Sequence, residues 1–203
     1  MYKRQYTNNG VSCDGPSETF TITVNPTAQV DSVVDQVLCN GESTDAIEFT
    51  TTNTDGTTVF NWTNDNTNIG LAASGTGDIP SFIAANSFNN ELISTIVVTP
   101  TYTNNGVSCD GPSETFTITV NPTAQVDAVV DQVLCNGEST DAIEFTTTNT
   151  DGTTVFNWTN DNTTIGLSAS GTGDIPSFIV TNSFNNELIS TIVVTPTYTN
   201  NGV

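Results

Sequence analysis

The sequence contains no histidine and only two basic residues, Lys3 and Arg4, against 22 acidic residues, so its formal net charge is −20. A protein needs Lys and Arg to bind phosphates, and this shortage excludes nucleic acid and anionic membrane surfaces as partners. It also excludes Ser-His-Asp and Cys-His catalysis, phosphate-binding loops and guanidinium clamps. No apolar run approaches the roughly 18 residues that span a membrane. We therefore expect neither an enzyme nor a nucleic-acid-binding or membrane-inserted protein.

A near-identical repeat occupies almost the whole chain. Residues 6–107 recur as residues 102–203, at an offset of 96 residues. A period of this length is the size of one small domain and too long for one turn of a solenoid. The positions that differ between the copies are Ser32/Ala128, Asn68/Thr164, Ala72/Ser168, Ala84/Val180 and Ala85/Thr181. We therefore expect a tandem array of whole domains.

The polar and apolar pattern predicts β-strands and no long helix. Thr, Val, Ile and Phe suit half-buried pleated surfaces, while Asn, Gly and Asp supply turns. Residues 19–24, TFTITV, alternate apolar and Thr side chains, as expected for a strand with one wet face. Ile47 and Phe49 should share one buried face, and Phe60 and Trp62 should do the same. About seven such short strands per repeat, separated by turns, predict an all-β fold of antiparallel β-sandwiches.

The repeat is best divided at the proline that ends the TFTITV strand, because proline lacks the N–H that a ladder needs. On this division residues 6–25 are the C-terminal strand of a preceding domain. Residues 26–121 form one complete domain. Residues 122–203 form a second domain that lacks its last strand.

The first five residues, MYKRQ, break the repeat. They contain both basic residues and the only methionine of the chain. They also match the translated end of a common transposase sequencing adapter. We expect residues 1–5 to be a non-native scar, and both ends of the chain to be cuts through a longer protein.

Four cysteines fall into two classes, VSCDG at Cys13 and Cys109 and VLCNG at Cys39 and Cys135. Because domains usually close their own disulfides, Cys39 and Cys109 are the favoured pair. Their bridge would close a loop worth roughly 4 kcal/mol in the chain-entropy model. Pairing Cys13 with Cys39 and Cys109 with Cys135 remains open, and so do buried free thiols. Zinc is disfavoured, because the chain has neither C-x-x-C pairs nor histidine.

Three blocks of the repeat carry a family resemblance: VDQVLCNGEST, FNWTNDNTNIGLAASGTGDIPSF and GVSCDGPSETFTITVNPT. The chain after residue 5 resembles the PKD-like, immunoglobulin-like tandem repeats of large Bacteroidota surface proteins. The resemblance implies a β-sandwich in each repeat and a disulfide between the two Cys-Gly motifs, here Cys39 and Cys109. It also implies export and tandem display outside the cell, without enzyme activity or a defined ligand.

Loop aspartates are the candidate metal ligands. Ca²⁺ needs about six to eight converging oxygen ligands, and loops rich in Asp and Asn can supply them. The candidates are Asp55, Asp65, Asp78, Asp151, Asp161 and Asp174. Since no D-x-D-x-D-G run is present, aspartates that form solvated turns are the simpler interpretation. We therefore expect no cofactor, and Ca²⁺ is the one candidate.

Each repeat contains one tryptophan, Trp62 or Trp158. On a central strand we expect this side chain to pack in the core, and stacking on a ligand is the alternative. A glycosidase would place a carboxylate pair in a cleft between aromatic platforms. One tryptophan per repeat does not favour such a site.

Composition and repetition favour a non-enzymatic stalk, spacer or multivalent adhesin segment, and the family resemblance implies that it belongs to a large, extracellular bacterial cell-surface protein. The expected partners are neighbouring domains of the same chain, with surface glycans or other cells as candidate targets. A disulfide would imply an oxidising compartment and would agree with secretion. The alternative is a ligand-binding module for a glycan or calcium, appended to a secreted enzyme.

Overall fold

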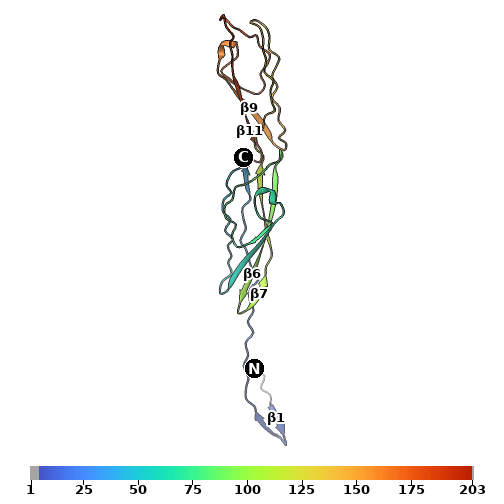
Figure 1. The fold of residues 1–203 in the computed structure, drawn as a ribbon. Helices are drawn as coiled ribbons and strands as arrows, with labels where there is room; N and C mark the ends of the chain where they lie inside the picture. The colour runs from blue at the N-terminus through green and yellow to red at the C-terminus, as the bar shows by residue number, and fades with distance from the viewer. Residues whose placement is uncertain (1–4, 203) are drawn as a thin grey trace.

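The computed structural model describes residues 5–202, which form an elongated all-β molecule (Figure 1). We call residues 5–25 the N-terminal arm, residues 26–121 the first unit and residues 122–202 the second unit. The arm, the first unit and the second unit follow one another along the long axis of the molecule. Within this range there is no α-helix, and no helix long and apolar enough to cross a membrane. Apart from Gln5, the scar expected at residues 1–5 lies outside the described residues.

The two units share one sequence pattern but differ in the strands that they form. The first unit contains β3 to β8, and the second unit contains β9 to β11. In chain order the elements are β1 (Gln5–Asn8), β2 (Val11–Asp14), β3 (Gln36–Cys39), β4 (Thr57–Asn64), the 3-10 turn η1 (Thr67–Ile69), β5 (Ser74–Thr76), β6 (Leu92–Asn104), β7 (Val107–Asp110), β8 (Glu114–Asn121), β9 (Thr153–Asn160), the 3-10 turn η2 (Thr163–Ile165), β10 (Ser170–Thr172) and β11 (Ile192–Thr199).

The first unit is built on one mixed sheet with the order β3-β8-β6-β4-β5, and β7 also pairs with β6. All neighbours are antiparallel except β3 and β8, which run parallel with Cys39 opposite Asn121. The expectation of purely antiparallel sheets is wrong at this pair. The long strand β6 organises the sheet, because it pairs with β4, β7 and β8. It ends at Asn104 and is followed by Asn105 and Gly106, whose φ angles of 50° and 75° suit the tight turn of an Asn-Gly hairpin.

Strand alternation places the core of the first unit on one face of this sheet. Ile47 and Phe49 are both buried, as the pattern predicts. Phe60 and Trp62 in β4 are buried together in the same core. Opposite the sheet, extended segments are joined by isolated bridges such as Ile47–Ile79 and not by a regular ladder. The unit therefore has two all-β layers, compatible with a β-sandwich, of which one is a regular sheet.

The second unit has a smaller sheet with the order β10-β9-β11. Ile192 and Val194 in β11 are only partly buried, whereas Ile96 and Val98, one period earlier, are 0% exposed. The difference follows from pairing. In the first unit β6 is covered by β8, whereas β11 pairs with β9 alone and the described chain has no counterpart of β8 in the second unit.

The N-terminal arm shows the same dependence on a partner. Residues 18–25 have the sequence of β8, but they form no strand, so the strand predicted at residues 19–24 is wrong for this copy. Ile22 is 81% exposed in the arm, whereas Ile118 in β8 is 0% exposed. A sequence with high β-propensity becomes a strand only where a neighbouring strand and an apolar layer receive it.

Candidate functional site at the joints between units

The four cysteines do not form the expected disulfide, because all four are free thiols. Cys39 lies beside Asn121, at the end of the sheet where β6 begins with Leu92. Cys109 pairs with Tyr102, ten residues further along β6. Ten extended residues span about 33 Å, far more than the roughly 7 Å that a disulfide allows between Cα atoms. The expectation that Cys39 and Cys109 close one domain is therefore wrong.

The four thiols differ in exposure according to their neighbours. Cys13 and Cys135 are exposed, whereas Cys39 and Cys109 are partly buried. Burial raises the pKa of the Cys39 thiol, and the negative charge of Glu42 raises this pKa further. Glu42 is held close because its Oε2 accepts a hydrogen bond of 2.8 Å from the Cys39 backbone N–H. Cys39 therefore carries less thiolate at neutral pH than an ordinary cysteine does.

The six candidate calcium ligands do not converge on one site. Asp55 and Asp65 lie beyond opposite ends of β4. Asp65 Oδ1 accepts a hydrogen bond of 2.7 Å from the Thr95 N–H, and Asp78 Oδ1 accepts one of 2.9 Å from the Phe49 N–H. Their counterparts in the second unit are Asp151, Asp161 and Asp174. Asp161 and Asp174 likewise each accept a hydrogen bond from a backbone N–H, whereas Asp55 and Asp151 accept from the hydroxyls of the preceding threonines.

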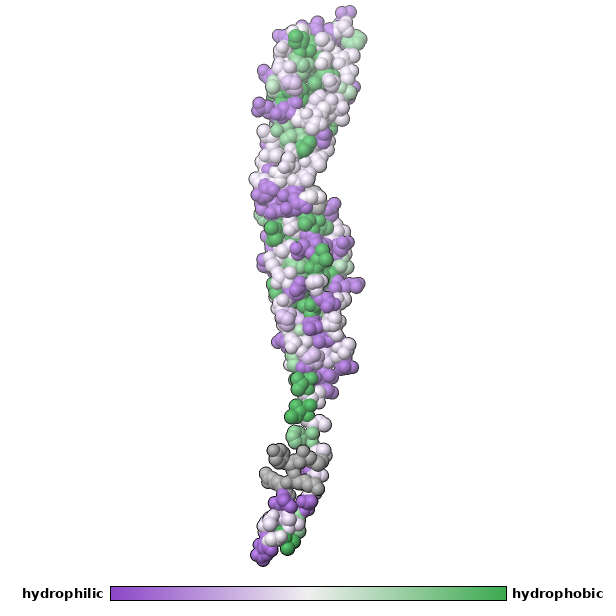
Figure 2. Space-filling view, turned by 180° about the vertical axis from the view of Figure 1, so that it is seen from behind, coloured by the Kyte–Doolittle hydropathy of each residue, from purple (hydrophilic) through white to green (hydrophobic). Residues whose placement is uncertain are grey.

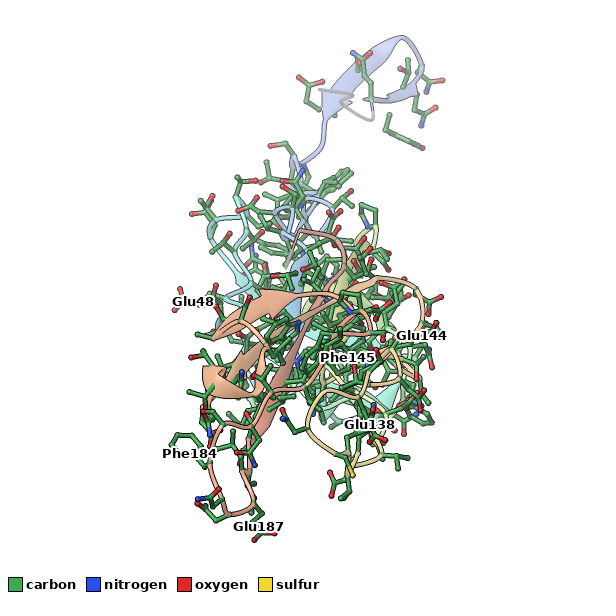
Figure 3. The ribbon with its side chains drawn as sticks, turned by 90° about the horizontal axis from the view of Figure 1, so that it is seen from above. Glu48, Glu138, Glu144, Phe145, Phe184 and Glu187 are labelled. Atoms are coloured by element: carbon green, nitrogen blue, oxygen red, sulfur yellow. The ribbon has the colours of Figure 1, made fainter. Side chains whose placement is uncertain are left out.

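Acidic side chains elsewhere are also dispersed. In the view from above in Figure 3, Glu48, Glu144 and Glu187 lie at different edges of the molecule. Among residues 5–202, no group of three or more Cys, Asp or Glu side chains is arranged to hold a metal ion.

Both tryptophans pack in the core, as expected. Trp62 is 7% exposed and Trp158 is 6% exposed. Each indole N–H donates to a backbone carbonyl, to Gly77 at 3.1 Å and to Gly173 at 3.0 Å respectively. A buried indole with a satisfied N–H has no free face for a ligand.

The residues that sequence reasoning missed lie where the first unit meets the second. Asn121 ends β8 and is 0% exposed. Its Nδ2 donates a hydrogen bond of 3.1 Å to the carbonyl of Asn200, just beyond β11. From the first unit, Glu91 Oε2 accepts hydrogen bonds from the Nδ2 groups of Asn200 at 2.7 Å and Asn201 at 2.8 Å. The turn that follows β11 is therefore held on two sides by the end of the first unit.

Two further hydrogen bonds complete this joint. Asn40 Nδ2 donates to Thr123 Oγ1 at 2.8 Å, and the Thr150 N–H donates to the Asn89 carbonyl at 2.9 Å. Hydrogen bonds of this kind contribute a net ~0.5–1.5 kcal/mol each, and those to a charged carboxylate contribute more. Several hydrogen bonds around the linker between the two units restrain rotation of one unit relative to the other better than the linker alone does.

The same contact recurs one period earlier, between the arm and the first unit. Asn25, the counterpart of Asn121, donates from Nδ2 to the carbonyls of Asn104 at 3.0 Å and Val107 at 3.3 Å. Asn104 is the counterpart of Asn200. The contact is therefore a property of the repeat. Its sequence signals are the Asn before Pro at the end of β8 and the Asn-Asn-Gly turn, which sequence reasoning treats only as a strand end and a turn.

Carboxylates of both units lie near Tyr198 at the joint between the first and second units. Burial raises the pKa of the Tyr198 hydroxyl, and the carboxylates of Asp151 and Glu91 raise it further, against a smaller lowering by a hydrogen bond with Asn200. The Tyr198 Oη donates a hydrogen bond of 2.7 Å to the Thr150 carbonyl. Glu91 belongs to the first unit and Tyr198 to the second, so the carboxylate of one unit lies close to the hydroxyl of the other.

Comparison with known proteins identifies no relative, since no protein-family model, curated protein or solved structure matches the chain. The geometry of the joints is therefore the basis for assigning a function.

Proposed function

We propose that this chain is a non-enzymatic, extracellular segment of a large bacterial surface protein, acting as a stalk or spacer or as a multivalent adhesin segment. The recurrence of one joint carries the proposal. Asn25 and Asn121 make the same contact with successive turns, at Asn104 and Asn200. A joint that recurs with the repeat can extend a chain of units along one line for any number of copies.

The distribution of charge supports an extended form. The whole sequence has 22 acidic side chains and only two basic ones. Screening confines their repulsion to about 8 Å at physiological salt, so it acts between neighbouring surfaces and not along the whole rod. Such repulsion keeps parallel rods from associating sideways and keeps them soluble.

The architecture of the units supports the finer assignment of the fold. Within the proposal, each unit is a PKD-like, immunoglobulin-like β-sandwich, and the repeats are separate domains with a boundary at Pro26 and Pro122. The regular sheet of the first unit and its facing layer enclose one apolar core. A short connection at each proline leaves little slack between domains, which favours a fixed geometry.

Solution scattering tests the extended arrangement. At a protein concentration low enough to keep single copies, small-angle scattering should give one elongated particle for the wild-type chain, and Asn121→Ala should add bending between the units. Asn25→Ala is the matched control, because it removes the same amide where no second folded unit is attached. Equal bending in both variants, or none in Asn121→Ala, would contradict a role of this joint in holding the rod straight.

A binding assay separates a spacer from a ligand-binding module. The isolated chain, applied to an array of surface glycans, should give no tight, saturable binding. Saturable binding by the single chain would favour the alternative module and would overturn the spacer role, whatever the shape of the molecule.

A further inference from the structure

The N-terminal arm exposes an apolar segment whose second copy, β8, packs in the core of the first unit. Phe20, Ile22 and Val24 are 84%, 81% and 86% exposed. Figure 2 shows apolar surface on the thin segment between the hairpin and the first unit. In β8, which has the same sequence as residues 18–25, the corresponding side chains are at most 2% exposed. The arm therefore carries a segment with the sequence of a core strand and no strand to pair with.

Within the described residues, the second unit lacks a strand at the matching position. β11 pairs with β9 along one edge, and its other edge forms no ladder within residues 5–202. In the first unit the equivalent edge of β6 pairs with β8 from Leu92 to Val98. Ile192 and Val194 beside this edge are only partly buried, whereas Ile96 and Val98 at the same positions of β6 are 0% exposed. An apolar, unpaired strand edge is a template for another strand.

We propose that, between copies of the 203-residue chain, residues 18–25 of one copy complete the second unit of another by pairing with residues 188–194, at and just before the start of β11. The register follows from the pairing of β6 with β8, which places Phe20 opposite Ile192 and Val24 opposite Leu188. No new packing is required, because the donor strand is identical in sequence to the strand that fills this place in the first unit. The main chain supplies the ladder and the alternating side chains supply the fit.

The occupant is a second copy and not the same chain. The arm and the second unit lie at opposite ends of the molecule with the first unit between them (Figure 1). Each copy thus has one donor and one acceptor on different surfaces, which generates open head-to-tail assembly. After the donated strand, the Asn25 contact with Asn104 places the next first unit as within a single chain.

Sedimentation velocity over a wide concentration range, with reductant present, tests the assembly. The wild-type chain of 21.4 kDa should form species of twice this mass and larger as concentration rises. Ile22→Asp should remain a single copy, because it would bury a carboxylate where Ile118 is 0% exposed. Thr19→Asp is the control with the same added charge. It should assemble like the wild type, since its counterpart Thr115 is exposed in β8.

Ile22 is exposed in the single chain, so Ile22→Asp leaves both units folded, and a thermal melt checks this. A synthetic peptide of residues 15–25 should cap the unpaired edge of the second unit and return assembled wild-type chains to single copies. A wild type that stays single at every concentration overturns the proposal, as does undiminished assembly of Ile22→Asp. Neither result bears on the proposed function, which depends on joints within one chain.

A separate observation concerns the thiols at the joints. Cys39 lies opposite Asn121, the residue that contacts the turn of the next unit. Cys109 lines a shallow hollow together with Thr23, Val24 and Asn25. Since Asn25 is the counterpart of Asn121, Cys39 and Cys109 mark the two sides of one kind of joint. Both thiols are partly buried at their joints, whereas Cys13 and Cys135 are exposed.

We infer that a cysteine of the Cys39 class bonds to a cysteine of the Cys109 class in the following unit. Between assembled copies this rule pairs Cys13 of one copy with Cys39 of the other, and Cys109 with Cys135. The two thiols lose two protons and two electrons as the S–S bond forms. An added disulfide such as oxidised glutathione accepts them and leaves as two reduced glutathiones.

Chains with two retained cysteines test this rule. After oxidation with glutathione disulfide, a chain that keeps only Cys13 and Cys39 should run as covalent multimers on a denaturing, non-reducing gel. A chain that keeps only Cys39 and Cys109 should run as a single copy. Adding Ile22→Asp to the first chain should abolish its multimers. Absence of multimers from the Cys13/Cys39 chain, or multimers from the Cys39/Cys109 chain, would contradict the inference.

Discussion

Two isoleucines with identical sequence neighbours provide a stringent test of the fold. Ile118 in β8 is 0% exposed, whereas Ile22 in the arm is 81% exposed. Replacing isoleucine by alanine removes roughly three methyl or methylene groups, about 2.4 kcal/mol at ~0.8 kcal/mol per buried group. The cavity that remains raises the expected loss at Ile118 to about 2–5 kcal/mol. At Ile22 no buried surface is lost, so the free energy of unfolding should stay nearly unchanged.

The assay is urea unfolding followed by tryptophan fluorescence. A Trp158→Phe background leaves Trp62 as the reporter of the first unit. For an m-value of about 1–3 kcal/mol/M, a loss of ~3 kcal/mol lowers the midpoint of Ile118→Ala by about 1–3 M. Low protein concentration keeps association from contributing to the result. Equal midpoints for Ile118→Ala and Ile22→Ala would refute the burial of β8 between β3 and β6.

Three more outcomes are expected. Gly75→Ala should lower the melting temperature markedly and cost about 1–3 kcal/mol of stability, because a Cβ at this position would lie 2.2 Å from the Trp62 ring. Iodoacetamide should alkylate Cys39 more slowly than Cys135. Burial and the charge of Glu42 raise the pKa of the Cys39 thiol, so the pH midpoint of its alkylation rate should lie above that of an ordinary thiol. Equal rates for the two cysteines would show that the joint does not shield Cys39. A chelator should leave the thermal melt unchanged because the candidate aspartates are dispersed, and a fall of many degrees would instead reveal a bound cation.

Local patterns in the sequence are sufficient to find the core. Alternation identifies the buried faces at Ile47 and Phe49 and at Phe60 and Trp62, because a strand has period two whatever it pairs with. The same patterns do not decide whether a segment becomes a strand. Residues 18–25 and β8 share every letter but only β8 has neighbours to pair with, so this difference is set by tertiary structure.

The joint and the cysteines lie beyond what one repeat can reveal. Asn121 is buried because the turn at Asn200 reaches it from the next unit. The Asn-Pro and Asn-Asn-Gly motifs mark a strand end and a turn, but the local sequence does not show that they contact each other. The Cys39–Cys109 pairing fails for a related reason. Cys39 and Cys109 lie far apart because the stretch of β6 from Leu92 to Tyr102 separates them. The number of residues between the two cysteines does not reveal this distance.

The central claim is that the joint fixes the two units in one orientation. Residual dipolar couplings measured on segmentally labelled chains, with one unit isotope-labelled at a time, report the alignment of each unit separately. A fixed joint predicts that one alignment tensor fits both units. Two tensors that differ in magnitude or direction would show that the units move independently and would contradict the claim.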